Sequence, residues 1–182
     1  MNFRTTRPAA DEYGAYYDRY IQQIPAGHDP VQRLREQQTE LHALFSGLGD
    51  EQALLRYAPG KWSIKETLVH IVDTERVFAY RALSIARGDQ TPLPGFDQEA
   101  FTANSGADAR PLAAILREYD AQRAATLALL ESFTPEALAR RGTASDLPVT
   151  VRALCYMLAG HEAHHLQLWR ERVWPLLTPA GA

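Results

Sequence analysis

The chain has 182 residues, enough for one domain whose hydrophobic core folds without disulfides or metal staples. Its formal net charge is −3, and its basic residues are dispersed among acidic ones, so the charge pattern does not indicate a nucleic-acid-binding protein. A single cysteine, Cys155, excludes an intramolecular disulfide framework and is compatible with a reducing compartment. The sequence shows neither a signal-peptide core nor the run of about 20 apolar residues that a membrane span requires, so we expect a cytoplasmic protein.

We expect one domain over residues 1–182, with a core of about 29–173 and an N-terminal extension of 1–28. The extension contains a short amphipathic stretch that ends near Ile24 and is typical of a short helix. Its aromatic positions are Tyr13, Tyr16, Tyr17 and Tyr20.

The first two long helices have clear start signals. Asp29 is a capping residue, and Pro30 suits the first helical position. The second helix opens with a capping box formed by Ser63 and Glu66 and runs to Arg87, where a glycine follows. The apolar positions expected to form much of its buried side are Ile64, Leu68, Ile71, Phe78, Leu83 and Ile85.

Two more long helices follow. One begins after Pro111, and the last runs from about Thr150 to Arg172, where Pro175 is expected to close it. Between them, Thr134 begins a short turn or helix. No segment shows convincing strand alternation, so the sequence predicts helices throughout.

The connection between the second and third long helices is unusually long. It extends from Gly88 to Arg110 and contains Pro92, Pro94 and Gly95. A connection of this length lets the two helices run parallel, with a crossover across the bundle. The sequence therefore predicts an all-α four-helix bundle with a long crossover between its second and third helices.

The last helix carries two histidines in an apolar stripe. Leu154, Leu158, His161, His165 and Leu168 are separated by steps of 4, 3, 4 and 3 residues, so they share one face. Two imidazoles one turn apart can hold one metal ion. The alternative is that both rings form hydrogen bonds in the core or line a wet cavity, because a buried unpaired imidazole costs free energy.

A third histidine, His70, lies on the second helix. It follows its N-cap by seven residues, roughly 10 Å along the helix, and His165 precedes Arg172 by the same number. The two rings therefore lie at one level if the second and fourth helices are antiparallel, and about 12 Å apart if they are parallel. The antiparallel packing gives a three-histidine site with an open position on the metal.

The segment His161-Glu162-x-x-His165 also matches the zinc-protease pattern. A protease of that type needs a further ligand downstream, but only Glu171 follows as an acidic residue and no histidine does. Leu168 stands where the chain would need a glycine to turn back. A protease is therefore disfavoured. Glu162 remains a candidate general base, with a supporting or surface role as the alternative.

Other polar residues are candidates for orienting the histidines or contacting a substrate. Side chains one turn before and one turn after His70 can orient its ring, unless they only form a half-solvated face. Glu75 and Arg81 are expected near the mouth of the site, and His164 is expected to face a neighbouring helix or solvent. The full set is Glu66, Asp73, Glu75, Arg81 and His164.

With these motifs the chain resembles the DinB-like superfamily over about 31–172. The resemblance rests on residues 61–66 leading to His70, on 73–76, on a turn at 141–144 and on 160–165. It implies an up-down-down-up bundle with a divalent metal, zinc or nickel, near one end. The family's three metal ligands map onto His70, His161 and His165. This topology makes the second and fourth helices antiparallel, which is the direction that puts His70 and His165 at the same height.

The resemblance also implies several activities, because similar proteins include thiol-dependent transferases and isomerases and proteins called metal-dependent hydrolases. Our first hypothesis is an S-transferase in detoxification or stress response that uses a low-molecular-weight thiol of the bacillithiol or mycothiol type. The metal would hold the thiol as a thiolate, which would attack an electrophile. Arg81 or the loop around Phe96 would help to seat the thiol.

Two alternatives stay open. In a hydrolase, the metal would activate water and Glu162 or Glu66 would serve as the base. The third hypothesis is a non-enzymatic, stress-induced metal-binding or ligand-binding bundle, or a dimer with a structural site. We expect a small-molecule substrate and no nucleic-acid or membrane partner. The oligomeric state stays open, with a homodimer as one alternative.

Overall fold

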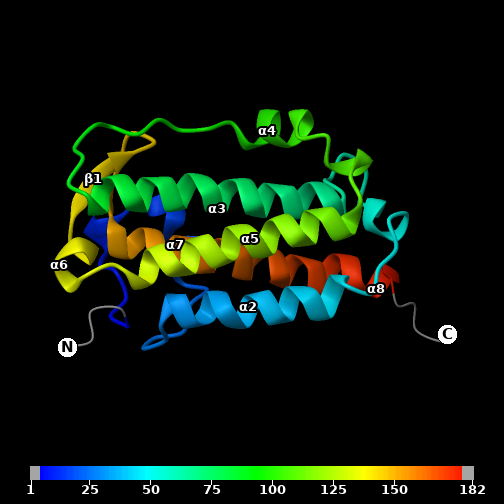
Figure 1. Ribbon diagram of the computed structural model, residues 1–182, viewed down its shortest axis with the longest axis horizontal. Helices are drawn as coiled ribbons and strands as arrows, with labels where there is room; N and C mark the ends of the chain where they lie inside the picture. The colour runs from blue at the N-terminus through cyan, green and yellow to red at the C-terminus, as the bar shows by residue number, and fades with distance from the viewer. Residues whose placement is uncertain (1–4, 178–182) are drawn as a thin grey trace.

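Four long helices form the body of the protein (Figure 1). They are α2 (Pro30–Phe45), α3 (Ile64–Ala86), α5 (Leu112–Glu131) and α7 (Val151–Leu168). The structure, a computed structural model, describes residues 5–177. The all-α four-helix bundle expected from the sequence is confirmed.

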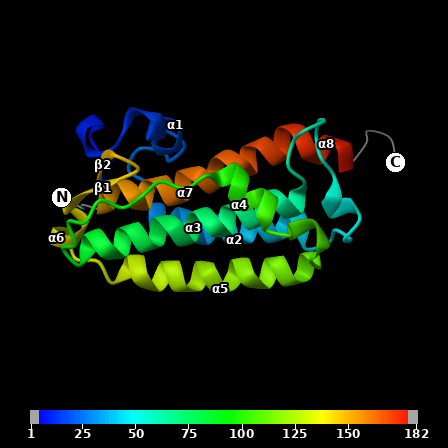
Figure 2. The same ribbon diagram turned by 90° about the horizontal axis from the view of Figure 1, so that it is seen from above.

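The four helices run up-down-down-up. In Figure 1, α2 and α7 run from left to right, whereas α3 and α5 run from right to left. The connection over residues 87–111 returns the chain along the outside of α3, as Figure 2 shows, so that α3 and α5 are parallel neighbours. Helices α3 and α7 pack against each other and are antiparallel. This is the arrangement that places His70 level with the two histidines of α7.

The helix starts are stabilised by the expected caps. The Val31 N–H donates to Asp29 Oδ1 at 2.9 Å. At α3 the capping box is complete, because the Glu66 N–H donates to Ser63 Oγ at 3.0 Å and the Ser63 N–H donates to Glu66 Oε2 at 2.9 Å. These bonds satisfy backbone donors that have no partner inside the helix. The register of the helix that carries His70 is therefore fixed at its first turn.

Helix α7 is the most enclosed element. Every residue from Val151 to Ala163 is buried, because α1 (Asp18–Ile21), α2 and α3 all pack against it. On α3 most of the expected apolar side is buried, but Leu83 is 36% exposed and so was assigned wrongly to the core. Its neighbour Tyr80 is exposed as well, which indicates that this face of α3 points outward.

A two-stranded hairpin precedes α7, and it corrects the expectation that no strand is present. Strand β1 (Arg141–Ala144) pairs antiparallel with β2 (Leu147–Thr150). The segment expected as a turn at 141–144 is therefore a strand. Two strands of four residues are too short to show a clear alternation. Their turn uses Ser145 and Asp146, with φ of 52° and 60°, where an Asn-Gly pair would have been the recognisable signal.

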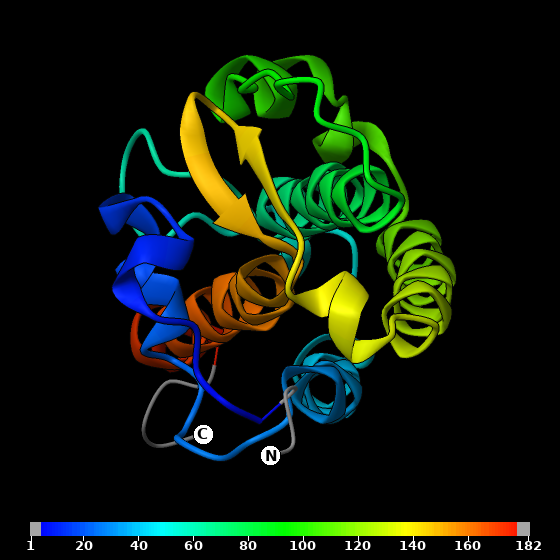
Figure 3. The same cartoon turned by 90° about the vertical axis from the view of Figure 1, so that its left-hand side faces the viewer.

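The crossover is tied to this hairpin. The Leu93 N–H donates to the Thr143 carbonyl at 2.9 Å, and the Ser145 N–H donates to the Leu93 carbonyl at 3.0 Å. Further along, the crossover forms α4 (Gln98–Asn104), and α6 (Pro135–Leu138) lies between α5 and the hairpin. The crossover and hairpin thus form one wall on the outer side of α3, visible end-on in Figure 3.

The N-terminal segment lies against α7 on another side of the bundle (Figure 3). The segment comes very close to α7 at Gly160: a Cβ atom added to this glycine would lie 2.0 Å from the Tyr20 carbonyl oxygen. Only a residue without a side chain fits there. Gly160 therefore lets Tyr20 pack beside His161, the next residue on α7.

The C-terminal helix does not end at Arg172. The chain continues through a π-helical turn, Trp169–Val173, into α8 (Trp174–Leu177). The expectation that Pro175 closes the helix was therefore wrong. Proline is tolerated in the first turn of a helical segment, and Pro175 is the second residue of α8.

Within residues 5–177, no helix combines the length and apolar character needed to cross a bilayer.

Candidate metal centre

Three histidine rings from two antiparallel helices meet inside the bundle. His70 lies on α3, and His161 and His165 lie one turn apart on α7. The Nε2 atom of His161 is 3.0 Å from that of His70 and 3.2 Å from that of His165. All three side chains are buried, and their candidate ligand atoms lie within 4.8 Å of one another. The geometry unites the three residues that the sequence singled out.

The spacing of these nitrogens suits a divalent metal. In a tetrahedral site with Zn–N distances of about 2.0–2.1 Å, ligand nitrogens lie about 3.4 Å apart. The observed separations of 3.0 and 3.2 Å are close to that value. Three protein ligands leave a fourth position open, as in catalytic zinc sites. Imidazole nitrogens also suit nickel, so the donor set fits either ion.

Burial keeps the three rings neutral. It lowers the pKa of His70 to about 4. The pKa values of His161 and His165 lie well below the ordinary value, first because of burial and then because the other imidazoles would repel a second positive charge. A metal needs the lone pair of a neutral imidazole, so the site is ready to bind a cation without first losing protons at neutral pH.

The rings are held mainly by aromatic packing. The Trp62 ring lies 4.7 Å from His70, and the Tyr20 ring meets His161 edge-on at 5.3 Å. The buried Nδ1 of His165 has no hydrogen-bond partner in the described part of the chain. In metal-bound histidines the N–H of the second ring nitrogen usually donates a hydrogen bond to a carboxylate or carbonyl, so the support of His165 departs from the common pattern.

Glu162 belongs to a buried ionic network that joins all four long helices. Arg123 of α5 donates through Nη2 to Glu162 of α7, and also to Glu75 of α3 at 2.8 Å. Its Nη1 donates to the Leu34 carbonyl of α2 at 2.6 Å. Tyr119 donates its hydroxyl proton to the other Glu162 oxygen at 2.6 Å. The network satisfies the carboxylate that follows His161 in sequence.

This placement does not favour Glu162 as the general base. Both of its carboxylate oxygens accept hydrogen bonds, from Tyr119 and from Arg123. Glu162 also lines neither the cavity that opens on His165 nor the one that opens on His161. Burial raises its pKa, although the Arg123 guanidinium opposes that rise. Glu75, expected near the mouth of the site, instead lies in the core against Arg123, because that guanidinium needs a carboxylate partner away from water.

The remaining candidate residues lie around the site with partners of their own. Glu66 completes the α3 cap and pairs with Arg56, and Asp73 pairs with Arg76 at 3.0 Å. His164 is half-buried, with its ring 5.8 Å from that of Tyr20, as expected for a residue that faces a neighbouring element.

Arg81 is buried rather than open at the mouth of the site. Its Nη2 donates to the Pro94 carbonyl at 2.7 Å and to Ser145 Oγ at 3.0 Å. It therefore joins the crossover to the turn of the hairpin.

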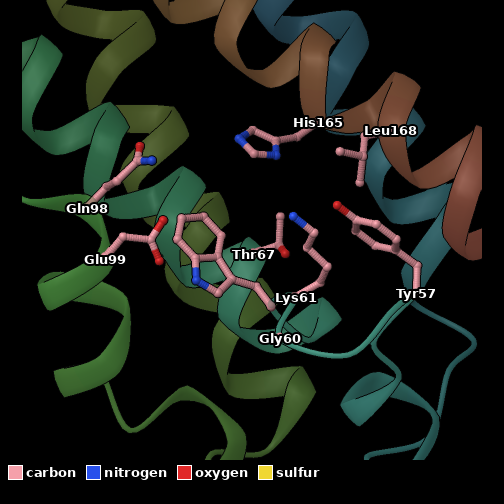
Figure 4. Close-up of a pocket in the computed structure, with 9 residues that line it drawn as sticks. Tyr57, Gly60, Lys61, Thr67, Gln98, Glu99, His165 and Leu168 are labelled. Carbon is pink, nitrogen blue, oxygen red and sulfur yellow. The ribbon is translucent and has the colours of Figure 1, made fainter.

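One cavity, which we call the His165 cavity, opens on the metal centre from the α4 side and has a volume of about 230 Å³. Figure 4 shows Gln98 and Glu99 of α4 facing the loop that carries Gly60 and Lys61, with His165 above them. Its lining mixes charged and polar side chains with apolar ones, and it consists of Tyr57, Gly60, Lys61, Trp62, Thr67, Gln98, Glu99, His165 and Leu168.

A second cavity, which we call the His161 cavity, opens on the neighbouring ligand and has a volume of about 300 Å³. Its walls come from the N-terminal segment, α3, the crossover, the hairpin turn and α7. Its lining is largely aromatic, and it consists of Tyr16, Tyr17, Tyr20, Thr74, Phe78, Gly95, Phe96, Gln98, Ser145 and His161. The three histidines thus lie between two cavities of different chemistry.

Comparison with known proteins agrees with this fold. The family model of the DinB superfamily matches residues 33–168. The chain belongs to the DinB superfamily. A relative from Geobacillus kaustophilus is 27% identical over 150 residues, covering 79% of this chain and 83% of the relative. One from Oceanobacillus iheyensis is 25% identical over 141 residues, covering 76% and 80%. Both are named "Putative metal-dependent hydrolase".

A solved structure shares the fold of this DinB-superfamily member. It is YfiT from Bacillus subtilis, described as "a probable metal-dependent hydrolase with an unusual four-helix bundle topology". The two superpose with a TM-score of 0.70 and 17% sequence identity, covering 94% of this chain and 98% of YfiT. The likeness establishes the bundle topology.

Sequence reasoning missed several cavity residues of this DinB-superfamily protein. Tyr17 and Tyr20 lie in the N-terminal extension, and Gln98 and Glu99 lie in the crossover. None of these segments has a periodicity that would direct it toward the histidines. The one available signal was Gly160, a glycine inside a helix immediately before a candidate ligand, which indicates a close approach by another segment.

Proposed function

We propose that the protein is a metal-dependent enzyme that acts on a small molecule, with hydrolysis as the reaction that the site and its relatives support best. The observation that carries the proposal is the convergence of three neutral imidazole nitrogens between two open cavities. His70, His161 and His165 would hold one divalent ion, zinc or nickel. When bound in such a site, the ion acidifies a water or thiol ligand, so that a nucleophile forms near neutral pH.

Two charged residues of the His165 cavity, Glu99 and Lys61, would handle the proton and orient the substrate. Because Glu162 is engaged by Arg123, we assign the role of proton acceptor to Glu99, a carboxylate that lines this cavity together with His165. Lys61 lines the opposite side and would attract a polar or anionic group of the substrate (Figure 4). Trp62 packs on His70 and covers the site from bulk water on that side.

A second candidate is transfer of a low-molecular-weight thiol, such as bacillithiol or mycothiol, to an electrophile. The two cavities, which share Gln98 in their walls, favour this reaction, because a thiol and an electrophile could reach the centre from different sides. Phe96 lines the His161 cavity, so the loop that carries it could contact one of the two reactants. Arg81 would act only indirectly, by holding the loop that carries Phe96.

Elemental analysis followed by turnover tests this proposal. We expect about one divalent ion per chain in the purified protein and almost none in His161→Ala. Metal-loaded protein is then assayed with a panel of small esters and amides, and separately for consumption of bacillithiol or mycothiol with electrophiles. Hydrolysis that Glu99→Gln slows at least tenfold, with Glu162→Gln less affected at equal metal content, supports the hydrolase. Thiol consumption without hydrolysis supports the transferase, and absence of bound metal overturns both.

A further inference from the structure

The His161 cavity differs from the His165 cavity in the chemistry of its walls. Five of its ten lining residues are Tyr or Phe, and none is Asp, Glu, Lys or Arg. The His165 cavity, by contrast, is lined by Lys61 and Glu99. An uncharged, aromatic wall binds planar apolar groups by burial and ring stacking. Its volume of about 300 Å³ lies at the lower end of the range for small-molecule sites.

One polar side chain that borders this cavity has a hydroxyl without a partner among the described residues. Thr74 lines it, is 3% exposed, and its Oγ1 makes no hydrogen bond within the described residues. A buried hydroxyl without a partner is unfavourable, and such groups in native proteins call for a specific explanation. Thr74 follows His70 by one helical turn, so it lies on the face of α3 that carries the candidate ligand. A bound molecule that offers an oxygen acceptor would supply the missing partner.

A second buried threonine on α3, Thr67, does have a hydrogen-bond partner, so of these two the missing partner is specific to Thr74. Thr67 lies on the same helix and is also buried, but it lines the His165 cavity. Its Oγ1 donates to the Ser63 carbonyl at 2.8 Å. A threonine on α3 can therefore satisfy itself through its own helix, whereas the hydroxyl of Thr74, a residue that borders the His161 cavity, has no such bond within the described residues.

The walls of the His161 cavity are held in place independently of any ligand. Arg81 bridges Pro94 of the crossover and Ser145 of the hairpin turn. On the other side, the close contact between Gly160 and the Tyr20 carbonyl holds the N-terminal segment against α7. A cavity formed in advance binds its ligand without the entropy cost of ordering loops.

We propose that the His161 cavity is the specificity pocket of the enzyme, and that it takes an uncharged aromatic group whose adjoining carbonyl or hydroxyl oxygen accepts a hydrogen bond from Thr74. The inference rests on the proposed function, because the aromatic group would enter here while its reactive group lies at the three histidines. It names the substrate class as aryl-substituted small molecules with a polar group next to the ring. The charged groups of a substrate or second reactant would lie in the His165 cavity.

Binding of two paired probes to zinc-loaded protein tests this assignment. Benzohydroxamate and acetohydroxamate carry the same metal-binding group and differ in the aromatic ring. By titration calorimetry we expect benzohydroxamate to bind at least tenfold more tightly. Phe96→Ala should narrow that ratio at least threefold, whereas Leu168→Ala, in the His165 cavity, should leave it unchanged. A ratio near one, or a ratio that responds to Leu168→Ala and not to Phe96→Ala, overturns the proposal.

The role of Thr74 is tested by two identical substitutions on one helix. Thr74→Val removes the hydroxyl at nearly constant volume, and we expect it to weaken benzohydroxamate binding at least threefold. Thr67→Val makes the same change at the other cavity and should leave this binding unchanged. Equal effects of the two substitutions would overturn the hydrogen bond to Thr74.

A measurement without metal separates this inference from the proposed function. In NMR titrations of metal-stripped protein with benzamide, we expect larger shifts at Thr74 and Phe96 than at Thr67 and Leu168. If the protein binds no metal but benzamide gives this pattern, the cavity assignment stands and the enzymatic proposal fails. If zinc binds with three-histidine dependence but benzamide shifts no signal in the His161 cavity, the specificity pocket is overturned and the metal centre stands.

Discussion

Arg123 of α5 donates a hydrogen bond to the carboxylate of Glu162, the residue that follows the candidate ligand His161 on α7. Both side chains are almost completely buried, and the same guanidinium also binds Glu75 of α3. The carboxylate that matches the zinc-protease pattern in the sequence is therefore part of a link between helices. Its position fixes the rotation of α7, and with it the direction in which His161 points.

Removal of the Arg123 guanidinium should strongly destabilise the bundle. Arg123→Met leaves two buried carboxylates and the Leu34 carbonyl without their cation, and breaking a buried ion pair from one side typically costs about 3–5 kcal/mol. The free energy of unfolding from urea titration measures the effect. Arg35→Met, which breaks an exposed pair with Glu131, should cost less than about 1 kcal/mol. Equal losses in the two variants would contradict a structural role for the network.

Substitution of any of the three candidate ligands should remove the bound metal, whereas substitution of the neighbouring His164 should not. We expect His70→Ala, His161→Ala and His165→Ala each to reduce the metal content from about one ion per chain to almost none. His164→Ala should retain the metal, because its ring lies beside Tyr20 and is not part of the three-histidine cluster. Elemental analysis after dialysis gives the content, and circular dichroism checks that each variant is folded. Loss of metal in His164→Ala would show that the ligand set is wrong.

The part of the site that could be predicted from sequence is the part governed by helical geometry. The spacing of His161 and His165 places both on one face, and the capping box sets the height of His70. Each of these relationships lies within one helix. The antiparallel direction of α3 and α7 was left open by the spacing of the residues; the family resemblance implied it, and the structure has it.

The parts that could not be predicted depend on contacts between segments far apart in sequence. Nothing near Glu162 indicates that Arg123, on a different helix, would engage it. Similarly, the N-terminal tyrosines reach the His161 cavity only because Gly160 lacks a side chain. Tertiary packing of this kind leaves only a weak local signal, such as one glycine within a helix.

Substitution of Gly160 should displace the N-terminal segment. Replacing a glycine within a helix by alanine normally raises the free energy of unfolding by up to about 1 kcal/mol. Here the new Cβ would lie 2.0 Å from the Tyr20 carbonyl oxygen, a backbone atom that can move only with its segment. We therefore expect Gly160→Ala to be net destabilising by about 1–3 kcal/mol. Thermal unfolding measures the loss, and hydrogen exchange should show faster exchange in residues 15–24.

Gly47→Ala is the matched control for this substitution. Gly47 lies in the turn after α2, where an added Cβ would meet no atom within 4 Å and φ is not positive. Its stability should change by less than about 0.5 kcal/mol. If Gly160→Ala were as stable as the wild type, with unchanged exchange over 15–24, the close contact would not hold the segment in place.

The ion pair between Glu12 and Arg152 should make stability depend on pH in a predictable direction. Both side chains are largely buried. Burial by itself would raise the pKa of Glu12, but hydrogen bonds from the Ala9 N–H, Arg152 and Thr150 outweigh it, and the pKa is lowered. The folded state thus favours the ionised form more than the unfolded state does. This contribution is present above the unfolded pKa of about 4.5 and is lost as pH falls through the lower folded value.

Glu12→Gln removes this titration, so the difference in unfolding free energy between wild type and variant should itself depend on pH. Hydrogen bonds to a charged group are worth about 1.5–3 kcal/mol, and we expect a gap of that order at pH 7. The gap should stay constant down to about pH 5 and narrow below about pH 4.5, as measured by urea titration at each pH. Asp11→Asn, which alters an exposed pair with Arg141, should differ from wild type by less than about 1 kcal/mol at pH 7. A Glu12→Gln gap that is the same at pH 7 and at pH 3.5 would show that folding does not stabilise the ionised form of this carboxylate.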